Sequence, residues 1–306
     1  MINRSKIKYS LKKLLPKSIF DLILALWQTI FRKLVDILDA LRLKRFNNYR
    51  TIETEHHGHK FSLFISPKNG FIDKHIFLYG TYEPQILDLL VTYLKKGSTF
   101  VDIGANIGQH SMLAGSIVGD TGKVYSFEPI PYIYEQFLDS LKINHFERIV
   151  HAHNVALGKE NKEESLYVEK NNVGGSSIVS SKGKEGEKIS ITIKRGDELL
   201  ESLSRIDMVK IDVEGYEYEV LVGIKKTLKK HKPIIVLEFS GKLYSEKGGT
   251  DGGAILSLLR ELDYAMYDVE DYMKKITSTE EFLTPFTKEK SQCDILCLPK
   301  QHAYEI

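Results

Sequence analysis

The sequence predicts an α/β fold built on a doubly wound, mostly parallel sheet of seven strands, preceded by a basic helical arm and a β-hairpin. Three observations predict it. Short apolar runs alternate with amphipathic helical segments from about residue 82 onward, a glycine-spaced turn follows the first of these runs, and the first 50 residues carry helical periodicity alone. Repeated strand and helix units of this kind place helices on both faces of a parallel sheet.

Residues 1–50 form the predicted arm. Apolar side chains recur at three- and four-residue steps from Leu15 to Leu41, the spacing of one stripe on a helix. The arm holds twelve Lys and Arg against three Asp, whereas the whole chain has a net charge of only +2. The rest of the chain is therefore acidic, which argues against a nucleic-acid partner.

Two roles remain open for this arm. Its residues 15–45 either associate with the chain's own domain or a second copy, or lie on a membrane surface with the basic side chains near anionic headgroups. Asp21, Arg32 and Lys33 interrupt the apolar residues, so we expect no membrane-spanning helix.

Residues 51–81 are interpreted as a β-hairpin and a connector. The hairpin covers residues 52–65 and turns at His57-Gly58. His56, His57 and His59 cluster at this turn, where histidines are more often solvated than bound to metal. We therefore assign no metal to them.

The third predicted domain spans residues 82–306. Its expected strands lie at 99–103, 123–127, 149–155, 206–212, 232–240, 264–270 and 293–299, with an added strand pair at 164–170 and 187–195. Helices are expected at 84–96, 217–230 and 254–263, and the last strand, which has no helix after it, should be an antiparallel addition to the sheet. Cys293 and Cys297 share one strand face and are interpreted as buried thiols, which favours a cytoplasmic location.

The turn after the first of these strands indicates a nucleoside site. Gly104 and Gly108 permit close approach of a ligand, and a helix N-terminus follows. The dinucleotide spacing G-x-G-x-x-G is absent, since Asn106 takes the middle position. Glu128 ends the next strand, 24 residues after Gly104, where a carboxylate accepts hydrogen bonds from ribose hydroxyls. An adenosine with an amino-acid tail, as in S-adenosylmethionine, fits a turn without room for pyrophosphate.

The segments VDIGANIG, SFEP, NVALG, VKIDVEGYEYEVLVGIKKTLKKHKPIIVLEFS and DILCLPK together resemble the FkbM family of class I S-adenosylmethionine-dependent methyltransferases, from about Tyr82 to Pro299. The resemblance implies a Rossmann-like fold, S-adenosylmethionine as cofactor, and O-methylation of a sugar in a glycan, glycolipid or secondary metabolite. It implies donor contacts with the methionine part from Asp102, Gly104, Asn106 and Gly108, with the ribose from Glu128, and with the adenine edge from Asn154 and Val155. Glu83 would face the donor or the substrate.

Catalysis is expected at the ends of the fourth and fifth strands. Lys210, Asp212, Glu214 and Glu238 lie there among apolar neighbours, where a carboxylate without a partner is costly. They are interpreted as a base or substrate clamp, the alternative being a structural ion pair such as Lys210 with Glu238. Either Asp212 or Glu238 accepts the hydroxyl proton, or two acids hold a divalent ion; no metal ligand is assigned. His110 is interpreted as a packing or donor-contact residue.

Other functions stay open at this point. A methyltransferase acting on RNA or protein is one alternative, and it would need a basic groove near Asp212. A catalytically silent donor-binding scaffold is the other, although the presence of both the donor residues and the acids argues against it. If the arm lies on the inner face of a membrane, a lipid-linked saccharide becomes the favoured acceptor over a small molecule in solution.

Overall fold

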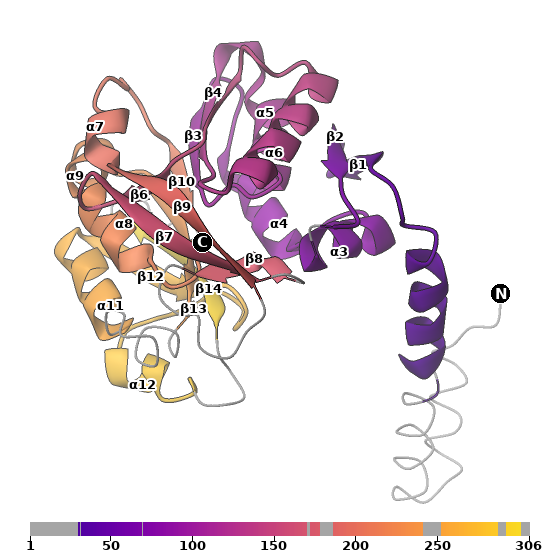
Figure 1. Ribbon diagram of the computed structural model, residues 1–306. Helices are drawn as coiled ribbons and strands as arrows, with labels where there is room; N and C mark the ends of the chain where they lie inside the picture. Colours follow the sequence, from indigo (N-terminus) through magenta and orange to yellow (C-terminus); the bar gives the residue numbers. More distant parts are fainter. Residues whose placement is uncertain are drawn as a thin grey trace, which may run out of the picture. The chain divides into compact units, whose positions relative to one another are not determined.

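The computed structural model describes residues 30, 32–68, 70–169, 172–177, 186–240, 252–286 and 292–300 (Figure 1). The chain divides into two compact units, Met1–Asn47 and Asn48–Ile306. In the first unit residues 32–43 are helical, and the remaining positions of the predicted stripe, 15–29 and 31, lie outside the described residues. Among the described residues no helix is both long enough and apolar enough to span a bilayer.

The described helix of the first unit presents an apolar stripe to solvent. Ile30, Leu34, Ile37, Leu38 and Leu41 are each more than half exposed. At 100° per residue these five positions fall within a third of the helix circumference. The predicted amphipathic pattern is therefore real in the part that the structure describes.

The second unit contains the predicted doubly wound sheet. Its strand order is β13-β12-β14-β11-β10-β3-β4-β5, eight strands where seven were expected, because the two-residue β13 extends one edge. β5, β4, β3, β10 and β11 are mutually parallel, and β14 runs antiparallel to β11 as predicted. The strand bounds are β3 Thr99–Ile103, β4 Lys123–Phe127, β5 Val150–His153, β10 Met208–Ile211, β11 Ile234–Phe239, β12 Tyr264–Asp268, β13 Lys274–Lys275 and β14 Cys293–Pro299.

The order of strands reverses between β3 and β10. From β3 the chain proceeds to β4 and β5 on one side, then returns to build β10 and β11 on the other. In doubly wound sheets ligands bind at the carboxyl ends of the strands flanking such a reversal. The predicted glycine turn follows β3 and therefore lies at this point.

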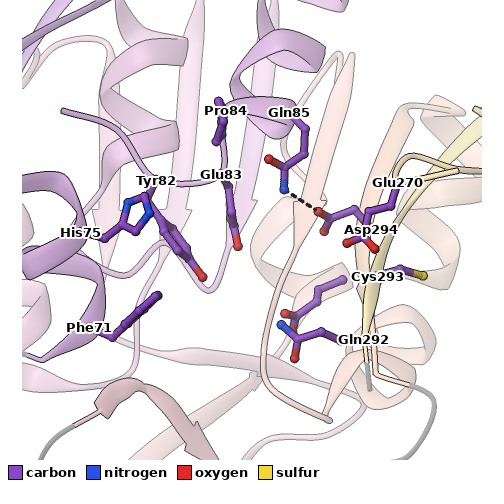
Figure 2. A pocket seen from close by; sticks show the side chains of 11 residues that line it. Phe71, His75, Tyr82, Glu83, Pro84, Gln85, Glu270, Gln292, Cys293 and Asp294 are labelled. Carbon is purple, nitrogen blue, oxygen red and sulfur yellow. Dashed lines mark hydrogen bonds between the residues drawn. The ribbon is translucent and has the colours of Figure 1, made fainter. Parts of the chain in front are cut away.

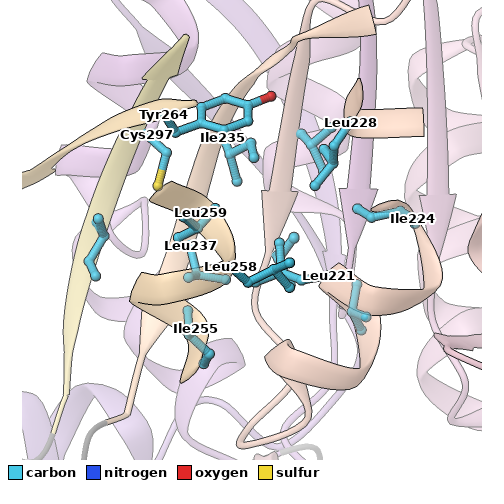
Figure 3. Packing of buried hydrophobic residues seen from close by; sticks show 14 of the residues in the cluster. Leu221, Ile224, Leu228, Ile235, Leu237, Ile255, Leu258, Leu259, Tyr264 and Cys297 are labelled. Carbon is cyan, nitrogen blue, oxygen red and sulfur yellow. The ribbon is translucent and has the colours of Figure 1, made fainter. Parts of the chain in front are cut away.

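Helices cover both faces of the sheet (Figure 1). α8, α9 and α11 pack on one face, where Leu221, Ile224, Leu237 and Tyr264 join a continuous buried cluster (Figure 3). Both cysteines are buried and not disulfide-bonded, as predicted. The helices are α3 Phe71–Tyr79, α4 Pro84–Tyr93, α5 Gln109–Val118, η1 Gly119–Thr121, α6 Pro131–Asn144, α7 Gly196–Leu200, α8 Glu217–Gly223, α9 Lys225–His231, α11 Gly252–Glu261 and α12 Thr279–Leu283.

The single helix predicted over residues 217–230 is wrong. The chain breaks between α8 and α9 at Ile224, whose φ and ψ of −110° and 15° are not helical. Gly223 packs directly on the backbone of Gly158, where a Cβ would lie 1.9 Å from the carbonyl oxygen. A tertiary contact that needs glycine at this position thus interrupts an otherwise helical pattern.

Two smaller sheets complete this unit. β1 Arg50–His56 and β2 His59–Ile65 form the predicted hairpin about His57-Gly58. β7 Lys162–Glu169 and β9 Gly186–Arg195 form the predicted antiparallel pair, within a sheet of order β6-β9-β7-β8. The additional strands are β6 Ala156–Gly158 and β8 Asn172–Ser177.

Candidate active site

The turn between β3 and α5 is shaped by residues in the left-handed region. Gly104, Asn106 and Gly108 have φ values of 81°, 51° and 87°. A Cβ on Gly104 would lie 1.8 Å from the carbonyl oxygen of Asp212, and one on Gly108 would lie 2.4 Å from the ring of Phe137. The turn therefore fits closely between the end of β10 and α6, and only glycine can occupy these two positions without displacement.

Glu128 ties this turn to the end of β4. Its side-chain oxygens accept hydrogen bonds from the backbone N–H of Asn106 at 2.9 Å and of Ile130 at 2.8 Å. Burial raises the pKa of Glu128 to about 7, against the opposing effect of these two hydrogen bonds. The amide of Asn154 donates to the backbone oxygen of Glu128 at 2.8 Å, and Val155 packs on the adjoining core. The residues expected at the donor thus meet at the carboxyl ends of three neighbouring strands.

Asp102 differs from the other predicted donor residues because its side chain is completely buried. Its Oδ2 accepts from the Ser111 hydroxyl at 2.6 Å, and its Oδ1 lies 3.9 Å from the Nζ of Lys210. Burial raises the pKa of Asp102, and Lys210 opposes that rise. Asp102 thus links the strand before the turn to α5 through Ser111 and to β10 through Lys210.

Lys210 pairs with Asp212. Its Nζ donates to Asp212 Oδ2 at 2.9 Å, and in the described part of the chain no ion pair joins it to Glu238. The structural ion pair considered as an alternative, Lys210 with Glu238, is therefore wrong in its partner. Burial lowers the pKa of Lys210, but Asp212, Asp102 and Glu83 raise it by more, so the ammonium stays charged.

Asp212, Glu214 and Glu238 converge. One carboxylate oxygen of each lies within 4.8 Å of the others. β10 ends at Ile211, so strand alternation does not bring Glu214 back to this side. Instead a loop does so, with φ values of 52° at Glu214 and 99° at Gly215. This loop is held by Glu217, whose Oε1 accepts from the backbone N–H of Gly215 at 3.0 Å.

Beside these acids lies a pocket of about 340 Å³ (Figure 2). The side chains of Phe71, His75 and Tyr82 form an aromatic wall on one side, with Tyr82 and His75 rings at a centroid distance of 5.5 Å. Carboxylates supply most of the charge around it. The residues lining the pocket are Phe71, His75, Tyr82, Glu83, Pro84, Gln85, Glu238, Glu270, Gln292, Cys293 and Asp294.

The aromatic wall is fixed to the helix that follows the glycine turn. Gln109, in the first turn of α5, accepts from the backbone N–H of Tyr82 at 2.7 Å and donates to the Tyr82 carbonyl at 2.7 Å. The neighbouring His110 Nε2 lies 3.7 Å from Glu83 Oε2. Burial and the nearby Lys210 keep the pKa of His110 well below its usual value, so the imidazole is neutral. His110 is buried, in keeping with the predicted packing role, and its neighbour on this side is Glu83.

Of the predicted site residues, Glu83 and Glu238 line the pocket, and Glu83 lies just before α4 with a φ of 49°. Burial, followed by repulsion from Asp212, raises its pKa to about 8. On the opposite side Asp294 accepts from the Gln85 amide at 3.3 Å, and burial raises its pKa to about 6. Figure 2 shows Glu83 and Asp294 on facing sides of the pocket.

The sequence analysis missed Asp294 and the aromatic wall. Asp294 stands in the apolar strand 293–299, so the argument that singled out Asp212 applied to it equally. Phe71, His75 and Tyr82 belong to an unrecognised helix and the turn after it, and no local signal joined them to residues two hundred positions away.

Comparison with known proteins places this arrangement in a known group. The family model described as "Methyltransferase FkbM domain" matches residues 102–266. The Hexuronic acid methyltransferase AglP of Haloferax volcanii is 28% identical over 158 residues, half of this chain and 61% of that protein. Methyltransferase 1 of Beauveria bassiana is 24% identical over 188 residues, covering 54% of this chain and 72% of its own.

Solved structures resemble the chain more distantly. Methyltransferase FkbM from Methylobacillus flagellatus has a TM-score of 0.40 and 13% identity, covering 73% of this chain and 52% of that one. A putative rRNA-methylase from Clostridium thermocellum has a TM-score of 0.44 and 12% identity, covering 70% and 93%. Likeness at this level carries no conclusion about activity or substrate.

Proposed function

The chain belongs to the FkbM methyltransferase family, and from this premise we propose that it transfers the methyl group of S-adenosylmethionine to a hydroxyl oxygen of a saccharide. The saccharide would be part of a glycan, a glycolipid or a secondary metabolite. The observation that carries the proposal is a pocket with one aromatic wall and several carboxylates that shares Glu83 and Glu238 with the acids beside the glycine turn.

The donor cradle fits S-adenosylmethionine. The turn at 104–108 lies so close to the backbone of Asp212 and to the ring of Phe137 that Gly104 and Gly108 have no room for a Cβ. It lacks the third glycine of a pyrophosphate-binding turn. Glu128, beside Asn106, is the acceptor for ribose hydroxyls, and the segment at Asn154 and Val155 lies where an adenine edge would be held. Asp102 would act on the methionine part through the turn that it supports.

The pocket has the chemistry of a sugar site. Apolar C–H faces of a pyranose pack on aromatic rings, and sugar hydroxyls donate hydrogen bonds to carboxylates. Phe71 and Tyr82 offer rings, and Glu83, Glu238 and Asp294 offer acceptors. The similarity to a hexuronic acid methyltransferase is consistent with a carbohydrate acceptor, although the matched region covers only 61% of that protein.

The reaction requires alignment and loss of one proton. When bound, the donor supplies a methyl group on a sulfonium sulfur that leaves as a neutral thioether. The acids at Asp212 and Glu238 lie where they would orient the acceptor hydroxyl and accept its proton as the oxygen forms its bond to carbon. Burial and the neighbouring Asp212 and Glu214 raise the pKa of Glu238 well above its usual value, which makes its carboxylate a stronger base. Lys210 holds Asp212 in place.

The test combines titration with turnover. Isothermal titration measures binding of S-adenosylmethionine and its demethylated product, and release of that product is then followed in a pool of saccharides. We expect Asp212→Asn and Glu238→Gln to bind the product normally and to lose at least about a hundredfold in turnover. Full turnover in both variants would remove the acids from catalysis.

Two other functions have weaker support. An RNA substrate would need basic side chains beside the acids, and no Lys or Arg lines the described part of the pocket. A silent donor-binding scaffold would bind the donor without releasing its demethylated form on any acceptor. The same pair of measurements separates each of these from a saccharide methyltransferase.

The location proposed for the enzyme is the cytoplasm, at the inner face of a membrane. The exposed apolar stripe from Ile30 to Leu41 and the excess of Lys and Arg in residues 1–50 together suit an anionic lipid surface. An acceptor on a lipid-linked saccharide would then share that surface with the enzyme. The competing partner for the stripe is a second copy of the chain.

A further inference from the structure

Two groups of side chains in the described residues are spaced to hold a metal ion. One is His56, His57 and Asp88, at the hairpin turn and α4, and the other is Asp212, Glu214 and Glu238. In the first group both histidine Nε2 atoms already lie at hydrogen-bond distance from Asp88 Oδ1, 2.8 and 2.9 Å away. His59, expected to belong to that cluster, is not part of it.

The carboxylate group brings like charges close together. One oxygen of each of the three carboxylates lies within 4.8 Å of the others. The ammonium of Lys210 lies beside them, where its Nζ donates to Asp212 Oδ2 at 2.9 Å and lies 3.9 Å from Asp102 Oδ1. Carboxylates at this separation repel one another, and a proton or a cation held between them relieves that repulsion.

Glu238 shows where that cation belongs. The residue is 8% exposed, and its Oε2 is buried without a hydrogen-bond partner in the described part of the chain. A buried carboxylate oxygen without a donor is costly. Glu238 comes from β11, whereas Asp212 and Glu214 come from the loop after β10, so the three approach one point from two elements.

We propose that Asp212, Glu214 and Glu238 bind one divalent cation that prefers oxygen ligands, such as Mg²⁺ or Mn²⁺. Three carboxylates with water in the remaining positions are an octahedral oxygen set. Glu238 also lines the pocket, so the ion would face a hydroxyl placed there. This consequence rests on the proposed function: a hydroxyl bound to the ion loses its proton more readily, which a carboxylate base alone achieves poorly.

Mn²⁺ binding tests the site without an acceptor. The full-length protein, treated with chelator and then desalted, is saturated with the demethylated donor and titrated with Mn²⁺ while the signal of unbound ion is followed by electron paramagnetic resonance. We expect one bound Mn²⁺ per chain, unchanged in Asp88→Asn, and at least about tenfold weaker in both Glu238→Gln and Glu214→Gln. Asp88→Asn is the matched control because it removes the other candidate cluster.

Three results would overturn the proposal. These are no Mn²⁺ binding below about 1 mM, loss of binding in Asp88→Asn, or equal binding in wild type and both Gln variants. Displacement of Mn²⁺ by S-adenosylmethionine but not by its neutral demethylated form would also overturn it, since the acids would then serve the sulfonium. Titration of the donor on the same samples tests the proposed function separately. A protein that binds Mn²⁺ but not the donor would contradict the proposed methyltransferase function and leave the metal site standing.

Discussion

At the scale of single residues, Gly104 has the least tolerance for change. Gly104 has a φ of 81°, and an added Cβ would collide with the Asp212 carbonyl. It lies where the turn at 104–108 meets the loop that carries Asp212 and Glu214. Gly58 offers the same backbone conformation, with a φ of 85°, but has nothing within 4 Å of an added Cβ. The pair therefore separates backbone strain from steric exclusion.

We expect Gly104→Ala to lower the free energy of unfolding by at least about 3 kcal/mol and to abolish donor binding, because the Cβ must displace the end of β10. Gly58→Ala should cost only about 1 kcal/mol and leave donor binding intact. Urea unfolding and calorimetric titration measure the two effects. Equal destabilisation in both variants would mean that the close contact at Gly104 relaxes easily.

Much of the residue-level site could be predicted. The glycine turn, Glu128 and the acids near the ends of β10 and β11 carry local signals: strand ends, missing side chains, and charge among apolar neighbours. What could not be predicted was which charged side chains form ion pairs with one another. That Lys210 bonds Asp212 rather than Glu238 depends on where β10 ends and how the next loop turns, which the pattern left ambiguous by one residue.

At the scale of elements, the first turn of α5 has two tasks. It follows the donor turn, and through Gln109 it holds both backbone polar groups of Tyr82. Removing Gln109 should free the aromatic wall without touching the donor. Gln109 is buried, so its replacement is compared with a change at Ser116 on the same helix, whose hydroxyl donates to the Leu113 carbonyl of that helix at 2.7 Å.

We expect Gln109→Leu to speed amide hydrogen exchange of residues 80–84 by at least about tenfold, because the Tyr82 N–H loses its acceptor. Affinity for the demethylated donor should change by less than about threefold. Ser116→Ala should leave both unchanged. Exchange rates identical to those of the wild type would show that Tyr82 is held by its other neighbours. Mass spectrometry of peptides from the native protein measures the rates.

The stripe on the helix of residues 32–43 is the second element with a testable partner. Full-length protein should sediment with vesicles of anionic lipid, less at high salt, and little with neutral lipid. Leu38→Asp should abolish sedimentation, whereas Asp36→Asn, on another side of the helix, should not weaken it. Equal sedimentation with neutral and anionic vesicles, or a dimer in solution that Leu38→Asp dissociates, would assign the stripe to other contacts.

Elements with long, clean periodicity carry a signal of their own in the sequence, and elements defined by tertiary contact do not. α6 went unrecognised although Pro131 at its first turn and Ile133, Phe137 and Leu141 at four-residue steps mark a helix. The break between α8 and α9 has no local signal stronger than one glycine, because its cause is the distant Gly158. The three-residue β6 likewise exists only by pairing with β9.

At the scale of the whole molecule, buried carboxyl groups make the stability of the protein depend on pH. Burial raises the pKa to about 8 at Glu83, about 7 at Glu128 and about 6 at Asp294, all above their ordinary values. A carboxyl with a raised pKa in the folded state contributes stability below its unfolded pKa and loses it as pH rises through the folded value. These groups therefore lose their contribution between about pH 4 and pH 8.

The free energy of unfolding without ligand should accordingly fall by at least about 1 kcal/mol from pH 5 to pH 8. Glu83→Gln should flatten that decline, and Glu53→Gln on the exposed face of β1 should not. Urea denaturation at the two pH values, in the presence of a chelator, gives the comparison. Stability that rises over the same interval would contradict the burial of uncompensated acids.

The architecture was the most predictable level. Seven strands in doubly wound order and an antiparallel last strand follow from the alternation of patterns, since a chain of βα units has few ways to fold. The edge strand β13 and the full four-stranded sheet β6-β9-β7-β8 were not predicted, because their strands are short or pair across a long insertion.

The pocket has a consequence for how this chain and its relatives diverge. Phe71, His75, Tyr82 and Glu83 come before residues 102–266, the range that the family model matches, and Glu270 and Asp294 come after it. Of the described residues that line the pocket, Glu238 alone lies inside that region. On the proposed function this pocket holds the acceptor, so a protein that matches the same family model over these residues need not share the side chains that would select the substrate.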